Sequence, residues 1–111
     1  MLEIDNQNNI TLTRGDTATL TLEITMNGQS YDYSNDLVQF TVKKNTVTDS
    51  IIIQKTFSGN SVTIEPTDTE SLDYQSLKYD VQVIKQGGEV YTVIPPSNFI
   101  IAPEVNFNVE A

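Results

Sequence analysis

The fifteen carboxylates are the side chains of this sequence with the widest choice of chemistry. Two groups are close in sequence: Asp32 with Asp36, and Asp68 with Glu70 and Asp73. Both offer the hard oxygen ligands that calcium prefers, but neither matches the alternating ligands, central Gly and terminal Glu of an EF-hand loop. A paired-carboxylate hydrolase needs two acids facing each other across a cleft, and no local pattern indicates such a pair. We therefore interpret both groups as solvated loop residues and expect no metal and no cofactor.

The residue types that are missing from the sequence further reduce the number of possible functions. The sequence has no Cys, no His and no Trp, which excludes a thiolate nucleophile, a Ser-His-Asp triad and zinc held by imidazole or thiolate. Six basic against fifteen acidic side chains give a formal net charge of -9. Nucleic-acid affinity needs clustered Lys and Arg, so we expect no nucleic-acid partner. Apolar runs such as 99–102 are far shorter than the roughly 20 residues of a membrane helix, so we expect no membrane contact.

Arg14-Gly15-Asp16 is the tripeptide that some integrin ligands display at a loop tip. Here it falls in a turn between two predicted strands. Gly15 suits a backbone conformation that other residues adopt poorly, and Asp16 can accept hydrogen bonds from nearby main-chain N–H groups. We therefore interpret the tripeptide as a structural turn.

The tyrosines are the residues best able to stack on a sugar or to anchor an interface. Tyr79 and Tyr91 lie in phase with apolar strand positions, which predicts that both belong to the core. Tyr79 could form a tyrosine corner, with its hydroxyl bonded to the turn at 68–72. Tyr31 and Tyr33 flank a polar loop and are predicted to be at the surface.

The elements that must position these residues are strands. The sequence contains 35 β-branched residues against three Ala, and β-branched side chains suit a pleated sheet while crowding a helix. Apolar and polar residues alternate in several segments, and Asn27-Gly28 and Gly87-Gly88 predict hairpin turns between them. The predicted strands are 16–26, 29–33, 38–43, 51–53, 61–65, 78–85, 89–94, 99–102 and 105–109.

Three local features refine these elements. Residues 51–53 are all Ile, which predicts a strand that is covered on both faces or packed under a loop. Residues 66–72 form the one short helical turn, capped by Thr67 or Asp68. Pro95-Pro96 is predicted to break the hydrogen-bonded ladder, because neither residue can donate a main-chain hydrogen bond.

The fold class predicted from this pattern is all-β: an antiparallel immunoglobulin-like β-sandwich of about seven to nine short strands with one short helical turn. A Greek-key or jelly-roll barrel is the alternative, since periodicity does not separate the two. We expect one domain over residues 1–111, with residues 1–8 and 103–111 flexible or ordered by assembly. The predicted core is formed by in-phase apolar residues, namely Leu20, Leu22, Ile24, Val38, Phe40, Val42, Val81 and Val83.

Three stretches carry a family resemblance: residues 10–17 leading into an alternating strand, residues 40–44, and Asp68-Thr69 together with residues 78–83. Together they resemble the small Ig-like β-sandwich structural proteins of tailed phages and prophages of low-GC Gram-positive bacteria, including the N-terminal module of baseplate upper proteins. The similarity covers roughly residues 8 to 102.

This resemblance implies a noncatalytic virion component, made in the bacterial host cytoplasm and located in the baseplate, in the tail or as a capsid decoration. Its implied partners are other virion proteins, with a homo-oligomer as a further possibility. Four positions carry over as architectural residues, namely Gly15, Asp16, Tyr79 and Asp80.

Assembly would use the sheet edges and the two chain ends, where a strand is most easily left unpaired. The polar residues 6–9 and the stretch 97–109 are the segments predicted to lie there. The candidate interaction surface comprises Tyr31, Tyr33, Asn8, Asn9, Phe99 and Phe107. The competing functions are a carbohydrate-binding module and a bacterial surface Ig-like interaction domain.

Overall fold

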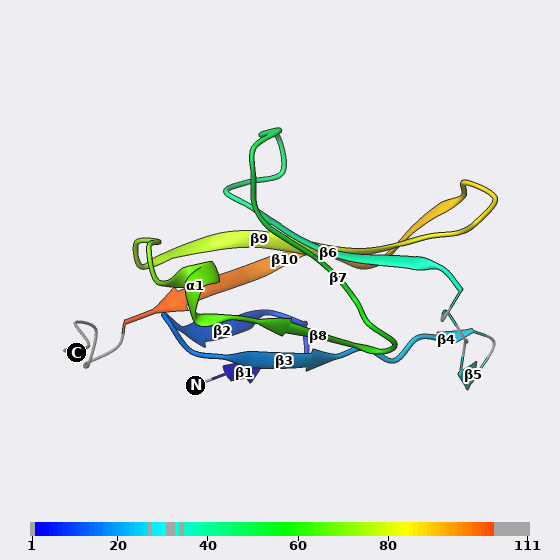
Figure 1. Ribbon diagram of the computed structural model, residues 1–111, viewed down its shortest axis with the longest axis horizontal. Helices are drawn as coiled ribbons and strands as arrows, with labels where there is room; N and C mark the ends of the chain where they lie inside the picture. Colours follow the sequence, from blue (N-terminus) through cyan, green and yellow to red (C-terminus); the bar gives the residue numbers. More distant parts are fainter. Residues whose placement is uncertain (1, 27, 31–32, 34, 104–111) are drawn as a thin grey trace.

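The computed structural model of the chain describes residues 2–26, 28–30, 33 and 35–103. It is an elongated molecule with a Cα radius of gyration of 14.8 Å, and almost all of its regular structure is β-strand. The elements, in chain order, are β1 (Leu2–Ile4), β2 (Ile10–Thr13), β3 (Ala18–Thr21), β4 (Thr25–Met26), β5 (Gln29–Ser30), β6 (Leu37–Lys43), β7 (Ile51–Thr56), β8 (Ser61–Ile64), α1 (Pro66–Thr69), β9 (Gln75–Ile84) and β10 (Val90–Ala102) (Figure 1).

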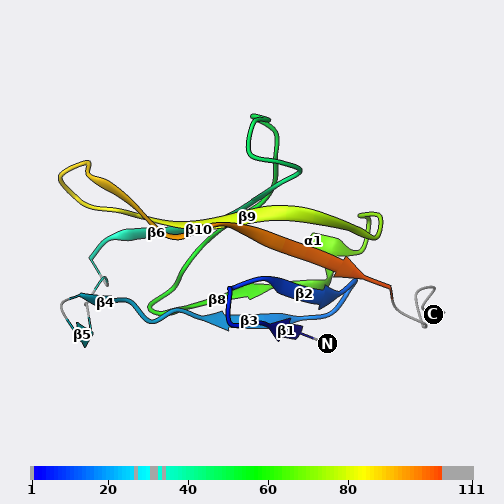
Figure 2. The same ribbon diagram turned by 180° about the vertical axis from the view of Figure 1, so that it is seen from behind.

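The strands form two packed layers, which confirms the predicted all-β sandwich with one short helix. A six-stranded sheet in the order β1-β2-β10-β9-β6-β7 faces the two-stranded sheet β3-β8, and β4 and β5 form a separate small hairpin (Figure 2). The described residues contain ten strands, more than expected, because β1 and β2 were not predicted and the predicted strand 16–26 is divided into β3 and β4. All pairs are antiparallel except β10 with β2, where Phe99 lies opposite Ile10 in a parallel register.

Strict alternation on the central strands builds the core. Along β6 and β9 every second side chain is buried, because successive side chains of a strand point to opposite faces. The predicted core is confirmed for all of its members except Ile24, which is only partly buried. Strands β2, β8 and β10 add further fully buried residues, including Leu12, Ile64 and Phe99.

Three aromatic rings join the central strands of the large sheet. The ring centroid of Phe40 on β6 lies 5.3 Å from that of Tyr79 on β9 and 6.0 Å from that of Phe99 on β10. The Phe40 and Phe99 rings are nearly perpendicular, an edge-to-face arrangement that aromatic pairs favour. This aromatic cluster ties β6, β9 and β10 together beneath the second layer.

The turns largely follow the sequence prediction. Thr25 pairs with Ser30 and Met26 with Gln29, so the β4–β5 hairpin has the expected two-residue connection at 27–28. Between β7 and β8, Ser58 and Ser61 exchange main-chain hydrogen bonds around Gly59, whose φ is 63°. This turn carries the chain from the large sheet to the second layer, where β8 pairs with β3.

Two predicted strand boundaries are wrong. The segment 16–26 is not one strand, because residues 22–24 leave the ladder between β3 and β4. Pro95-Pro96 does not end a strand, because β10 continues through it to Ala102. The register with β9 shifts on both sides of Ile94, so the prolines lie at a bulge where no ladder N–H is needed.

Two smaller predictions also need correction. Of the three Ile residues at 51–53 only Ile53 is buried, and Ile51 is 50% exposed because it faces outward at a register shift of β7. Neither Thr67 nor Asp68 is the N-cap of α1. Glu65 holds that position, and its main-chain N–H donates to the Asp68 carboxylate at 2.7 Å.

The first testable prediction concerns the aromatic cluster. Replacing Phe40, which is fully buried, by Ala should reduce the free energy of unfolding by about 3 to 5 kcal/mol, because both transfer energy and packing are lost. Replacing the half-exposed Ile51 by Ala is the control and should change it by less than about 0.5 kcal/mol. Urea denaturation of both variants provides the measurement, and equal effects of the two would contradict the core assignment.

Candidate functional site

Burial removes part of the predicted interaction surface. Tyr33 is 7% exposed, and its hydroxyl donates to the main-chain oxygen of Leu22 at 2.5 Å, so the prediction that it is a surface residue is wrong. Phe99 is fully buried in the aromatic cluster and is likewise no contact residue. Tyr31 and Phe107 lie outside the described residues.

Asn8 and Asn9 belong to the turn between β1 and β2, where they organise the fold. Asn8 is exposed and adopts a φ of 66°, a left-handed conformation that Asn tolerates better than most residues. The Asn9 side-chain oxygen accepts a hydrogen bond from the Asn98 main chain, which links the turn to β10. The Asp5 carboxylate accepts hydrogen bonds from Asn9 and from the Gln7 main chain, and these bonds hold the turn in place. The same bonds lower the pKa of Asp5.

Tyr79 is a core residue, as predicted, but its hydroxyl has a different partner from the one expected. It donates to the main-chain oxygen of Asn8 at 2.5 Å, not to the turn at 68–72. Burial, with a smaller contribution from the charge of Asp5, raises the pKa of Tyr79 to about 12. The side chain thus ties the β1–β2 turn to the centre of the large sheet.

The Arg14-Gly15-Asp16 turn is structural, as interpreted. Gly15 has a φ of 82°, and its N–H donates to the hydroxyl of Thr69 in α1 at 2.8 Å. The Arg14 guanidinium donates to the Leu72 main-chain oxygen at 3.0 Å and lies over the Tyr74 ring. The tripeptide therefore fastens the β2–β3 turn to the segment that follows α1.

The acidic groups do not converge on a cation. Asp68 forms an ion pair with Lys55 at 2.8 Å, and Asp36 lies 3.8 Å from Lys85. Asp32 lies outside the described residues. Among the residues that the structure describes, no three acidic side chains are placed to hold a metal ion together.

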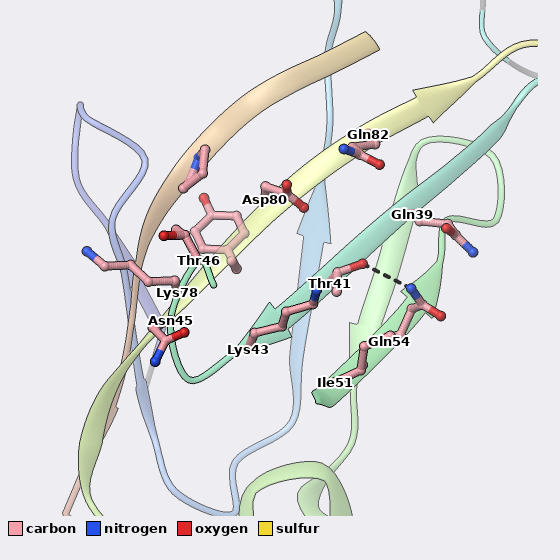
Figure 3. Close-up of a pocket in the computed structure, with 12 residues that line it drawn as sticks. Gln39, Thr41, Lys43, Asn45, Thr46, Ile51, Gln54, Lys78, Asp80 and Gln82 are labelled. Atoms are coloured by element: carbon pink, nitrogen blue, oxygen red, sulfur yellow. Dashed lines mark hydrogen bonds between the residues drawn. The ribbon is translucent and has the colours of Figure 1, made fainter. Parts of the chain in front are cut away.

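A hollow lies on the outer face of the six-stranded sheet, the face turned away from β3 and β8. It has a volume of about 270 Å³, and side chains of β6 and β9 form its floor (Figure 3). The loop 44–50 stands out from the sheet beside it (Figure 1), and Asn45 orders this loop by accepting the main-chain N–H groups of Val47 and Thr48. The lining residues are Gln39, Thr41, Lys43, Asn45, Thr46, Ile51, Gln54, Lys78, Tyr79, Asp80, Gln82 and Pro96.

Asp80 lies in the middle of this polar floor. It is directly opposite Thr41 on β6, two ladder positions from the facing pair Lys43 and Lys78. Burial raises the pKa of Asp80, and the charge of Lys43 offsets part of that effect. The carboxylate is therefore held at some cost to the fold, as expected for a charge that the sheet only partly exposes to water.

The edge at β7 offers a different kind of site, made of main-chain groups. No strand of the described chain pairs with β7 on the side away from β6. The N–H of Phe57 donates to the oxygen of Val38, which makes these two a hydrogen-bonded pair. Hydrogen-bonded and non-bonded pairs alternate in an antiparallel ladder, so Gln54 and Thr56 direct their N–H and C=O groups away from β6. We call this side of β7 the open edge.

The predicted edge at 97–109 is not found at 97–102. That part of β10 lies between β2 and β9, in the interior of the large sheet. The segment could not be placed from the sequence because its pairing with β2 is non-local. Residues 104–109 lie outside the described residues. The N-terminal end is an edge, since β1 pairs only with β2 among the described strands.

Apolar side chains are exposed on the β9–β10 hairpin, which extends beyond the second layer at one end of the molecule (Figure 1). Tyr91 is 48% exposed, so its predicted place in the core is wrong. It lies opposite the buried Val83, on a part of β10 that among the described strands pairs with β9 alone, because β2 pairs with β10 only at 99–102. On the other face Leu37, Ile84 and Val90 form one cross-strand row, of which Leu37 and Val90 are also exposed.

A scan against protein-family models, a search of curated proteins and a search of solved structures each find no match for this chain. The four-residue α1 is far too short to cross a membrane, and no other helix in the described ranges could do so. The case for a function therefore depends on the chain's own surfaces and on the short motifs of the phage resemblance.

The second prediction tests the Tyr79 hydroxyl. Tyr79→Phe should lower the free energy of unfolding by about 1 kcal/mol or more, because the Asn8 oxygen loses its donor. Tyr91→Phe removes a hydroxyl from an exposed ring and should have no effect. Chemical denaturation compares the two variants. An equal, negligible change in both would mean that the hydroxyl contributes nothing beyond its ring.

The third prediction follows from the raised pKa of Asp80. Because the folded state favours the protonated carboxyl, stability falls as pH rises from the ordinary pKa of 3.8 through the raised value. Asp80→Asn should therefore raise the melting temperature at neutral pH, and this gain should vanish below pH 3.8. Thermal denaturation as a function of pH, with the exposed Asp73→Asn as control, measures this difference. A lower melting temperature of Asp80→Asn at neutral pH would contradict it.

Proposed function

We propose that this chain is a noncatalytic structural protein of a phage virion, acting by assembly with other virion proteins in the baseplate, in the tail or as a capsid decoration. The observation that supports assembly is the open edge of β7, a six-residue strand whose outer ladder positions have no partner in the described chain. The virion setting is supported by the resemblance of residues 10–17, residues 40–44, and Asp68-Thr69 with residues 78–83 to phage Ig-like structural proteins.

The open edge is suited to strand addition by another chain. Free N–H and C=O groups at a sheet edge pair readily with an extended segment. Gln54 and Thr56, which direct their main-chain groups outward, carry no charge that would repel a neighbour. Lys55 points toward the other layer, where its ammonium group forms an ion pair with the Asp68 carboxylate at 2.8 Å. This charge therefore does not repel a strand that approaches the open edge. The edge therefore lacks a strong barrier to pairing.

The β9–β10 hairpin supplies a second contact of a different type. Val90 and Tyr91 are half-exposed on a hairpin that projects from the sandwich (Figure 2). Apolar and aromatic side chains of this kind contribute most to binding when a partner covers them. The open edge would fix the orientation of a partner strand through main-chain hydrogen bonds, and the hairpin would add apolar contact area. These two features together are typical of a protein that acts by assembly.

The alternative of a carbohydrate-binding module is supported by the hollow on the outer face, where Gln39, Gln54 and Gln82 offer amide donors and acceptors. Sugar sites commonly add an aromatic platform. The aromatic residue at the hollow, Tyr79, packs its ring against Phe40 and Phe99 instead. Assembly through the edge is therefore the better supported function.

The fourth prediction tests the open edge by a single substitution. Gln54→Pro removes an N–H that points away from β6, so the β6–β7 ladder should survive while strand addition is blocked. Gln54→Ala is the matched control, since it removes only the side chain and its contact with Thr41. Sedimentation velocity over a range of concentration and salt should show assembly of the wild type and of Gln54→Ala, but not of Gln54→Pro. Because the net charge is -9, assembly of like copies should strengthen as salt screens their repulsion.

Mass spectrometry of purified virions from a strain that carries this gene tests the virion setting separately. Detection of the chain in stoichiometric amount is the expected result. A strict monomer under all conditions, together with its absence from the virions, would contradict the proposed function.

A further inference from the structure

The basic side chains of this acidic molecule fall into two groups. Three are engaged with other parts of the chain: Arg14 with the Leu72 main chain, Lys55 with Asp68 and Lys85 with Asp36. Lys43, Lys44 and Lys78 form no ion pair with a described residue, and Lys43 and Lys78 line the hollow on the outer face. Two of the six cations therefore line one hollow of a chain whose net charge is -9, and the exposed Lys44 follows Lys43 directly in the sequence.

The arrangement within this surface is unfavourable for the isolated molecule. Lys43 lies directly opposite Lys78 on the neighbouring strand, and like charges in such a pair repel each other. Lys78 donates to the Asn98 side-chain oxygen, a neutral partner. Asp80 is the acid nearest in register, and its single carboxylate offsets only one of the two lysines that line the hollow. The surface thus keeps an excess of positive charge that an external anion would compensate.

The same surface adjoins the open edge. Gln54 on β7 lines the hollow, and its amide donates to Thr41 on β6 (Figure 3). Neighbouring strands lie about 4.8 Å apart, so a strand added to β7 would lie about 10 Å from β6. An extended Lys43 side chain and a Glu side chain on the added strand together span this distance. Lys44 is exposed at the start of the loop beside it.

We propose that the segment which pairs with β7 is acidic, with carboxylates at the alternate positions that face the hollow. Lys43 and Lys44 select this segment by charge, while the main chain of Gln54 and Thr56 holds it by hydrogen bonds. The inference rests on the proposed strand addition and goes beyond it by naming the chemistry of the partner. It also gives a strongly acidic protein a means of choosing an acidic partner segment, which its overall charge would otherwise repel.

The fifth prediction uses three short capped peptides as probes, in which Thr alternates with Glu, with Gln or with Lys. Each is titrated into the isotope-labelled full-length chain, and binding is followed by NMR. The Thr-Glu peptide should bind about tenfold more tightly than the Thr-Gln peptide, with the largest shifts in β7, and added salt should weaken the Thr-Glu peptide most. The Thr-Lys peptide should bind most weakly at the β7 edge.

Matched variants distinguish the contribution of the Lys43 and Lys44 charges from that of the open edge of β7. Lys43→Gln with Lys44→Gln should remove the preference for Glu over Gln. Asn6→Asp with Gln86→Glu lowers the net charge by the same amount at exposed turns far along the chain, and should leave that preference intact. Gln54→Pro should abolish binding of all the peptides. Circular dichroism melting curves confirm that each variant is folded before it is compared.

The possible failures distinguish the two proposals. Equal affinity for the Glu and Gln peptides, or equal losses in the two charge-matched variants, would overturn the acidic-segment inference and leave strand addition intact. Shifts away from β7, or binding that survives Gln54→Pro, would overturn strand addition itself. Absence of binding by every peptide would count against both.

Discussion

The packing of Phe40, Tyr79 and Phe99 is the interaction on which the rest of the structure depends. These rings come from three neighbouring strands of the large sheet, and they lie within 6.4 Å of one another between centroids. A chain without disulfides must be held together by such packing. The Tyr79 hydroxyl extends the cluster to the β1–β2 turn by its hydrogen bond to Asn8. Because the core is fixed at β6, β9 and β10, the outermost strands contribute less to it.

Because the core depends mainly on β6, β9 and β10, the outer face of the large sheet and its edge strand β7 are available for binding. On β6 and β9 the residues between the buried ones are polar and face outward, where they form the floor of the hollow. The neighbouring β7 buries Ile53 but leaves one row of main-chain groups without a described partner. Backbone groups of this kind can bind an extended segment without catalytic chemistry, and in the proposed complex the neighbouring lysines provide the selectivity. The proposed assembly function needs only these two features.

Local patterns predicted the fold where one face of a strand meets the core. Residues 38–43 and 78–85 alternate so regularly that their inward positions could be read from the sequence, and the structural role of the Arg14-Gly15-Asp16 turn followed from Gly15. Non-local features could not be predicted in this way. The burial of Tyr33 depends on a hydrogen bond to Leu22, and Tyr91 is exposed on a part of β10 that pairs with β9 alone among the described strands. The open edge itself is a property of strand order, which periodicity does not encode.

Amide hydrogen exchange along β7 in the dilute, monomeric chain tests the central claim most directly. We expect an alternating pattern, in which the N–H groups of Ile53, Lys55 and Phe57 are protected by β6 and those of Gln54 and Thr56 exchange fast. We further expect that Gln54 and Thr56 become protected when the chain assembles. Protection of Gln54 and Thr56 in the monomer equal to that of their neighbours would show that the edge is already paired, and would contradict the account.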